Sequence, residues 1–443
     1  MCSIRLFRPK YKLPIHHRRP DPILLRLPVE LLEAVLSNLL PVDLSRASRA
    51  CRQLHLVAVQ LLFKTVVLRT PQVIPFICAL DSNRELSRYV QSLTMHDHHL
   101  QLRDNIEAYK HYSDRISQTI ARLTNLRSLT IKACYHQQRP WTHPPSQLPR
   151  VLDETAVLKT LFLPALHSPF LASLRSCQLN LSDSETWELG DRECILLHPN
   201  LKSLSILGAL ILAFDSFTED HRHTTPLTEL TLLCCDLSPE VLAKILAVPK
   251  KLQKFTFIGA PQGIAWGKRT SDHHERYIDA MKLQAPSLVA LNISFWNRRY
   301  SHNPPVDFLC FPVLEDLTIS PGVLQGNGEH FHDLIPLTSN PFPPSLKHLT
   351  LYDVRYLFTL TLETTYVSLL SWWVAERSLP NLTTLTFANP HDYGIPSEPP
   401  SGWEAFQGKV AVQRREFIKL RRFPIDCECC EFNMGSWTLG FGH

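Results

Sequence analysis

Apolar residues recur along most of the chain in one six-residue pattern, apolar-x-x-apolar-x-apolar. The last three positions alternate, which is typical of a short strand with one buried face. Successive copies start between 25 residues (Leu227 to Leu252) and 43 residues (Leu158 to Leu201) apart, as expected for structural repeats with insertions. The ten copies start at Val90, Leu126, Leu158, Leu201, Leu227, Leu252, Leu288, Leu314, Leu346 and Leu382. A related hexad, LRSCQL, starts at Leu174, and the pattern leaves open whether it forms another strand.

The fifth position of each hexad is expected to face solvent, because it lies between two inward-facing apolar residues. Most copies carry threonine there, whose branched side chain favours strands and whose hydroxyl tolerates water. These outward positions are Thr94, Thr130, Phe162, Ser205, Thr231, Thr256, Asn292, Thr318, Thr350 and Thr386.

The segments between hexads include patterns that predict helices. In Asp236–Ala247, Ser238 suits an N-cap, Pro239 the first helical position and Glu240 the positive end of the helix. Strand and helix in alternation predict an α/β fold, a curved solenoid with a parallel sheet on its concave face and helices outside. After the last hexad, Glu404–Arg422 is expected to form a helix that caps the open end.

Residues 23–68 show a different pattern, in which apolar residues recur at helical spacing. Pro28 suits a helix start, Pro41 ends that helix, Asp43 suits the cap of a second, and Val57–Phe63 indicates a third. Three short helices cannot bury all this apolar surface among themselves, so we expect a partner or the adjoining repeats to cover the excess. The broad stripe of the first helix is Leu31, Leu32, Val35, Leu36 and Leu39.

Composition narrows the functional classes. A charge of +5, from 46 basic and 41 acidic residues, falls short of the basic footprint of a dedicated nucleic-acid binder, so no nucleic-acid partner is expected. No apolar run approaches the roughly 18 residues of a membrane span, and the start lacks a signal-peptide pattern. We therefore expect a non-membrane protein of the cytoplasm, the nucleus or both, with its 12 cysteines reduced.

Candidate catalytic and metal chemistry is sparse. Cys427, Cys429 and Cys430 form a tight cluster, but a structural zinc site needs four ligands and only His443 is near in sequence. Inert thiols are the favoured interpretation, with metal or redox use as the alternative. Neither a nucleotide-binding fingerprint nor a nucleophile elbow is present, so we expect a non-catalytic chain without a cofactor.

The hexads and the helices between them resemble leucine-rich repeats over residues 89–396. In the cysteine-containing type of repeat, the ninth position is Asn or Cys, and Cys134 and Cys235 match it. The positions occupied by Ala209, Ala260, His98 and Val354 do not match, which implies an irregular solenoid.

The segment from Leu25 to Leu68 resembles the F-box, through Leu27-Pro28, Glu30-Leu31-Leu32, Val35-Leu36, Leu39, Asp43-Leu44, Arg46 and Cys51-Arg52. Leu54 stands where many F-boxes have an aromatic residue. The resemblance implies a three-helix module that binds a Skp-type adaptor and, through it, a cullin scaffold. The implied adaptor-binding residues are Leu27, Pro28, Glu30, Leu31, Leu32, Val35, Leu36, Leu39, Leu44 and Cys51; the alternative is that they form only the core of the module.

The whole arrangement resembles fungal F-box proteins with leucine-rich repeats. The expected organisation is a basic, disordered tail (1–22), an F-box (23–68), a connecting helix or linker (69–88), the solenoid (89–396), and a C-terminal cap and tail (397–443). The implied function is the substrate-recognition subunit of a Skp–cullin–F-box ubiquitin ligase, whose repeats hold an unknown target protein for ubiquitin-dependent degradation. The alternative is a non-catalytic leucine-rich-repeat scaffold acting outside a ligase. The candidate substrate-binding residues are charged positions near the strands, namely Arg127, Lys159, Lys202, Glu229, Glu315 and Asp316.

Overall fold

A computed structural model describes residues 23–97, 115–133, 171–180, 187–259, 274–295, 306–319, 340–352, 378–389 and 411–416. The chain divides into two compact units, Met1–Val66 and Val67–His443.

The first unit contains three helices, α1 (Val29–Leu36), α2 (Pro41–Ala47) and α3 (Arg52–Lys64), preceded by the 3-10 turn η1 (Ile23–Arg26). Pro28 is the N-cap of α1. Pro41 follows the end of α1 and is also the first residue of α2. Proline is tolerated there because an N–H group at the first helical position would have no partner within the helix. The expectation that Asp43 caps the second helix is wrong: Leu40 is the N-cap and Asp43 lies in the first turn.

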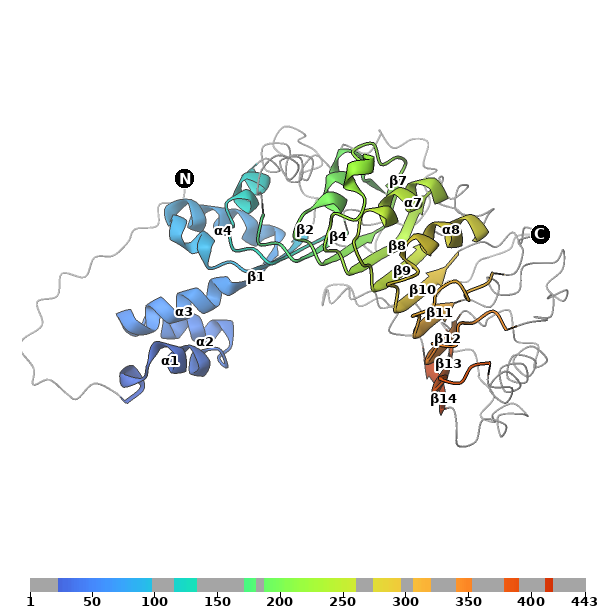
Figure 1. Cartoon of the computed structure of the whole chain (residues 1–443). Helices are drawn as coiled ribbons and strands as arrows, with labels where there is room; N and C mark the ends of the chain where they lie inside the picture. Colours follow the sequence, from blue (N-terminus) through green and yellow to red (C-terminus); the bar gives the residue numbers. More distant parts are fainter. Residues whose placement is uncertain are drawn as a thin grey trace, which may run out of the picture. The chain divides into compact units, whose positions relative to one another are not determined.

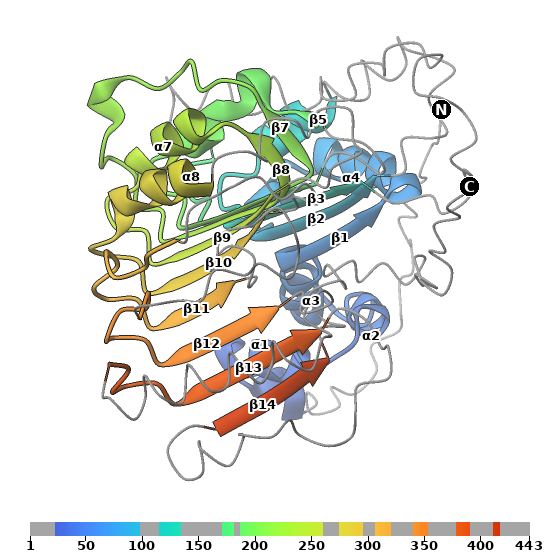
Figure 2. The ribbon, with the colours of Figure 1, turned by 90° about the vertical axis from the view of Figure 1, so that its right-hand side faces the viewer.

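The second unit is built on one parallel sheet in which twelve strands follow each other in chain order (Figures 1 and 2). These are β1 (Thr65–Arg69), β2 (Ser92–Asp97), β3 (Ser128–Ala133), β4 (Ser176–Asn180), β6 (Ser203–Leu207), β8 (Glu229–Leu237), β9 (Lys254–Gly259), β10 (Ala290–Ser294), β11 (Asp316–Ile319), β12 (His348–Tyr352), β13 (Thr384–Asn389) and β14 (Ala411–Glu416). Two short strands, β5 (Trp187–Glu188) and β7 (Ala209–Ile211), pair with each other, and β7 also pairs with the end of β8.

The register confirms the strand alternation predicted for nine of the ten hexads, but Thr386, the fifth position of the last hexad, is buried at 7% exposed instead of facing solvent. From β2 to β13 the fifth hexad positions are direct partners, and they are flanked by buried apolar residues such as Leu230 and Leu232. The aligned residues are Thr94, Thr130, Gln178, Ser205, Thr231, Thr256, Asn292, Thr318, Thr350 and Thr386.

One expected strand is replaced by another. The hexad at Leu158 lies outside the described residues, and its expected place between the Leu126 and Leu201 hexads is filled by β4, from the hexad at Leu174. A strand at Leu158 would turn Phe162 toward solvent, whereas β4 presents Gln178 there and buries Cys177 and Leu179. The polar alternation of the second hexad therefore suits the sheet better.

The helix expected over Glu404–Arg422 is wrong at residues 411–416, which form β14 and pair in parallel with β13 from Thr384↔Ala411 to Asn389↔Glu416. An unpaired edge of β13 would present a row of free N–H and C=O groups. As a strand, β14 supplies hydrogen-bond partners for these groups. A helix could not, because its backbone N–H and C=O groups are bonded to each other.

Helices lie outside the sheet and pack on its buried side chains. The helix α4 (Thr70–Ser82) follows β1 and buries Val73, Ile77 and Leu80. The helices α7 (Pro239–Ala247) and α8 (His274–Met281) lie side by side (Figures 1 and 2). Short 3-10 segments complete the unit: η2 (Arg84–Arg88), η6 (Gly190–Leu197), η7 (Glu219–His221) and η8 (Lys282–Gln284).

The structure confirms the helix predicted from Ser238 onward. The Ser238 hydroxyl accepts the N–H of Val241 at 3.3 Å, and Pro239 is the first helical residue. Leu242, Ile245 and Leu246 are buried.

We expect Ser238→Ala to destabilise α7 by about 1 kcal/mol, because the N–H of Val241 loses its acceptor. The measurement is the free energy of unfolding in urea. Ser238→Asp, which retains an acceptor for the N–H of Val241, is the control and should keep most of the stability. Equal stability of the alanine variant and the wild type would show that the cap contributes nothing.

Candidate functional site

The first helix carries two apolar faces. Leu32 and Leu36, one helical turn apart, are 0% and 3% exposed and pack against Leu44, Val57 and Ala58 in the core of the unit. A helix with one apolar stripe would present polar residues elsewhere. Here a second pair, Leu31 and Val35, is also one turn apart but is 53% and 46% exposed.

Exposed apolar residues continue beyond α1. Leu39 and Leu40 lie in the turn before α2, Val42 lies in its first turn, and the exposed fractions of Leu40 and Val42 are 69% and 61%. Leu56 on α3 is also exposed. Single exposed leucines are common on soluble proteins, but this density over three short helices is typical of a surface that a partner covers. We call Leu31, Val35, Leu39, Leu40 and Val42 the apolar surface.

The ten residues predicted to bind an adaptor therefore divide into three groups by exposure. Leu32, Leu36 and Leu44 are buried in the core of the unit. Leu27 and Cys51 are half-buried, and Cys51 is the N-cap of α3. Residues accessible to a partner are Pro28, Glu30, Leu31, Val35 and Leu39. Leu40 and Val42 were not predicted. The signal in the sequence is that both residues are apolar and lie on either side of Pro41, next to the stripe of the first helix.

The charged residues predicted near the strands are not brought together into one site. Arg127 and Lys202 are exposed, while Lys159 lies outside the described residues. Glu229 pairs with Lys254 at 2.8 Å, Glu315 pairs with Lys347 at 2.8 Å, and Asp316 lies 3.9 Å from His348. Two of the three acidic positions of the later strands, Glu229 and Glu315, are thus paired with lysines of the next strand.

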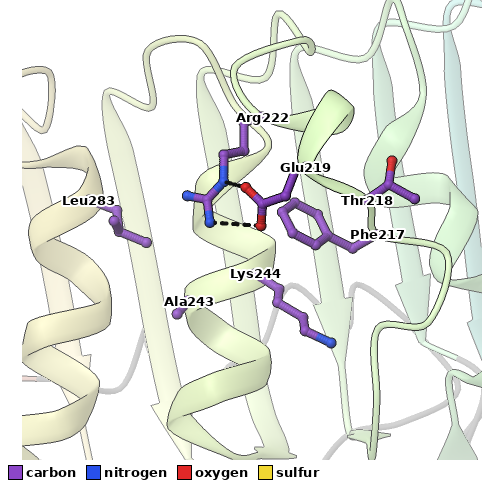
Figure 3. A pocket seen from close by; sticks show the side chains of 7 residues that line it. All are labelled: Phe217, Thr218, Glu219, Arg222, Ala243, Lys244 and Leu283. Atoms are coloured by element: carbon purple, nitrogen blue, oxygen red, sulfur yellow. Dashed lines mark hydrogen bonds and ion pairs between the residues drawn. The ribbon is translucent and has the colours of Figure 1, made fainter.

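A cavity of about 590 Å³ lies outside the sheet, between the segment around η7 and helix α7 (Figure 3). Arg222 forms an ion pair with Glu219 and lies 5.9 Å from the centre of the Phe217 ring. The ion pair holds the pKa of the Glu219 carboxyl below its ordinary value. Lys244 and Leu283 also line this open cavity, and the hydroxyl of Thr218 in the same lining lies 3.0 Å from Nδ1 of His221.

The buried cysteines are unreactive thiols. Burial raises the pKa of Cys235 to about 12 and also raises the pKa of Cys177, and for the half-buried Cys234 it raises the pKa to about 11. The thiolate is the nucleophilic form, so these side chains act as small apolar residues at neutral pH. Cys134 and the cluster of Cys427, Cys429 and Cys430 lie outside the described residues.

Within the described part of the chain, no three histidine, cysteine or acidic side chains gather as a metal site would require. The same residues contain no helix with the length and apolar character needed to cross a bilayer.

Comparison with protein families matches residues 24–69 to the model of the F-box-like domain. The match covers η1 and the three helices that carry the apolar surface, together with β1. The chain therefore contains an F-box-like domain, and it is followed by a mixed α/β unit with a parallel sheet. No curated protein matches the chain.

Proposed function

We propose that this protein is the substrate-recognition subunit of a Skp–cullin–F-box type ubiquitin ligase. The observation that carries the proposal is the F-box-like domain at residues 24–69, because F-box domains typically bind Skp-type adaptors. The exposed pair Leu31 and Val35 supports it by offering apolar side chains that the domain does not use in its own core.

The second unit would be the part that holds the target, and we propose that it is a leucine-rich-repeat solenoid. Two features support this: ten strands, β2 to β13 along the sheet, come from nine of the hexads and the related hexad at Leu174, and the fifth hexad positions are aligned across the parallel sheet. Each repeat of such an array is stabilised by its neighbours, so a long and continuous surface can be presented. The combination would be an F-box protein with leucine-rich repeats of the fungal kind.

The mechanism would be proximity rather than chemistry by this chain. An adaptor and a cullin scaffold would bring an activated ubiquitin near the target, and a bound target experiences a high effective concentration of it. The protein would accordingly need no catalytic group or cofactor of its own. It would act in the cytoplasm, the nucleus or both, where reduced thiols persist.

The second candidate is a scaffold whose F-box-like domain binds the adaptor without a cullin. The same exposed residues favour it equally, since they concern only the adaptor. The two functions differ in whether a cullin joins the complex.

We expect the tagged protein, isolated under native conditions from its own cells, to retain both a Skp-type adaptor and a cullin. The measurement is mass spectrometry of the purified complex, followed by a ubiquitination assay of proteins that copurify. A complex containing the adaptor without cullin would support the scaffold. Absence of the adaptor would contradict both functions.

A further inference from the structure

Three neighbouring strands begin with the same pair of residues, a cation followed by a serine. Arg127-Ser128 opens β3, Arg175-Ser176 opens β4, and Lys202-Ser203 opens β6. The serines are direct register partners across the three strands. We call these three pairs the basic-serine row.

Backbone hydrogen bonds hold the row in line. The carbonyl of Arg127 accepts the N–H groups of Arg175 and Ser176 at 2.8 and 3.0 Å, and the carbonyl of Arg175 accepts those of Lys202 and Ser203 at the same two distances. Neighbouring strands of a sheet lie about 4.8 Å apart, so the three cations begin from points spread over roughly 10 Å.

The central cation is also fixed through its side chain. Nη1 of Arg175 donates to the carbonyls of Ala172, Leu174 and Asn200 at 3.2 to 3.3 Å. The Nε and Nη2 groups keep further donors on the guanidinium. An ordered guanidinium loses less rotamer freedom on binding than a free one, which favours the engagement of an anion.

The row itself contains three cations and no acid, and the acid that borders it on β8, Glu229, the register partner of Ser203, is already paired with Lys254 at 2.8 Å. The exposed side chains of Arg127 and Lys202 have no ion pair within the described residues, and the turns leading into the three strands, 123–128, 171–176 and 198–203, contain no aspartate or glutamate. The later strands differ, because Lys254 and Lys347 each pair with a glutamate of the preceding strand at 2.8 Å. The uncompensated cations are thus confined to one part of the sheet.

We propose that the basic-serine row binds an acidic, extended segment of a partner protein through its aspartate and glutamate side chains. The half-buried serines at the starts of the same three strands carry further hydrogen-bonding hydroxyls. This surface rests on the proposed function in one respect: the partner would be the protein that the ligase, or the scaffold, recruits.

The spacing of the cations favours carboxylates over a phosphate group. A phosphate dianion is held by several donors that converge on one point, whereas this row supplies one cation per strand. Side chains on one side of an extended peptide recur about every 6.6 Å, so two or three acidic residues span the row. Nucleic acid fits less well, because the fifth hexad positions of β2, β3, β4 and β6 offer no aromatic side chain for stacking: Thr94, Thr130, Gln178 and Ser205.

The test is fluorescence anisotropy with the full chain and a labelled peptide of alternating glutamate and threonine. We expect salt-sensitive binding that is lost when glutamine replaces glutamate in the peptide. Arg127→Gln and Lys202→Gln should each weaken binding about two- to fivefold, and the double variant roughly fivefold or more, because each removes one exposed charge pair. Lys244→Gln is the matched control: it also removes an exposed lysine without an ion pair in the described structure, but on α7, and it should leave affinity within about twofold.

The same preparations are tested for adaptor binding, which the double variant should retain. If the double variant loses peptide binding but retains adaptor binding, the result supports the row as the peptide site. If the wild type fails to bind the adaptor, the result contradicts the proposed function and leaves the row untouched. Absence of wild-type peptide binding, or an equal loss in Lys244→Gln, would overturn the acidic-segment site. Tighter binding of a phosphoserine peptide, or of a single-stranded oligothymidylate, would overturn its assignment to carboxylates.

Discussion

Replacing Leu31 and Val35 together with glutamate is expected to abolish binding of a Skp-type adaptor while the three helices stay folded. Both side chains are about half exposed, so the carboxylates remain hydrated in the free protein and cost the fold little. In an apolar interface each unpaired carboxylate costs on the order of several kcal/mol. Since about 1.4 kcal/mol is tenfold in affinity, we expect a loss of more than about 100-fold.

Two further variants separate the interface from the fold. Leu212→Glu with Leu283→Glu changes charge equally at leucines that are each 42% exposed in the second unit, and this pair should bind the adaptor like the wild type. Leu32→Glu should instead unfold the domain, because Leu32 is fully buried in its core. Affinity is measured by titration with purified adaptor, and helix content by circular dichroism. A folded Leu31→Glu, Val35→Glu variant with wild-type affinity would remove the apolar surface from the docking site.

The sequence could not show which apolar residues of α1 are buried in the core and which are exposed. Its periodicity identifies Leu31, Leu32, Val35 and Leu36 as one broad apolar stripe. Which half of the stripe faces the core depends on where α2 and α3 pack, and this is a tertiary property. The apolar excess was visible in the sequence, whereas its location required the structure.

The sheet was largely predictable because one local pattern is repeated many times. The predictions were wrong where the local sequence fits more than one structure. The hexads at Leu158 and Leu174 lie within one repeat length, and only pairing with β3 and β6 distinguishes them. Residues 411–416 have a helical pattern but form a strand, because they pair with the otherwise open edge of β13. This pairing involves residues distant in sequence, so a short stretch of sequence does not reveal it.

At the ninth repeat position the Cys235 thiol donates to the carbonyl of Ile206 at 3.5 Å, and a second polar ladder lies just before five of the hexads. Side-chain amides of Asn125, Asn200 and Asn381 donate to carbonyls of the preceding repeat at 2.7, 3.0 and 2.9 Å. Hydroxyls of Ser287 and Ser345 do the same at 3.0 and 2.8 Å. The residue before the first leucine is thus Asn or Ser in five repeats, a signal present in the sequence.

A buried glutamine next to one member of this ladder makes more contacts: the hydroxyl of Ser287 lies 3.1 Å from Oε1 of Gln284. Gln284 is 3% exposed, and its Oε1 accepts the N–H of Leu252 at 2.9 Å. Its Nε2 donates to the carbonyls of Leu246 and Pro249 at 2.8 and 3.0 Å. One side chain therefore joins η8 to the end of α7 and to the turn before β9.

We expect Gln284→Leu to destabilise the second unit by roughly 2–4 kcal/mol, because three buried backbone groups lose their hydrogen-bond partner. The added apolar surface of leucine offsets part of this loss. The loss should be local first: amide hydrogen exchange at Leu252 should accelerate by about 30-fold or more, since its N–H no longer has the Oε1 acceptor. Gln253→Leu is the matched control, as Gln253 is an exposed glutamine beside the same turn, and its stability should stay within about 0.5 kcal/mol of wild type. Equal exchange at Leu252 in both variants would show that the buried amide does not hold the turn, and that the packing of α7 on β9 suffices without it.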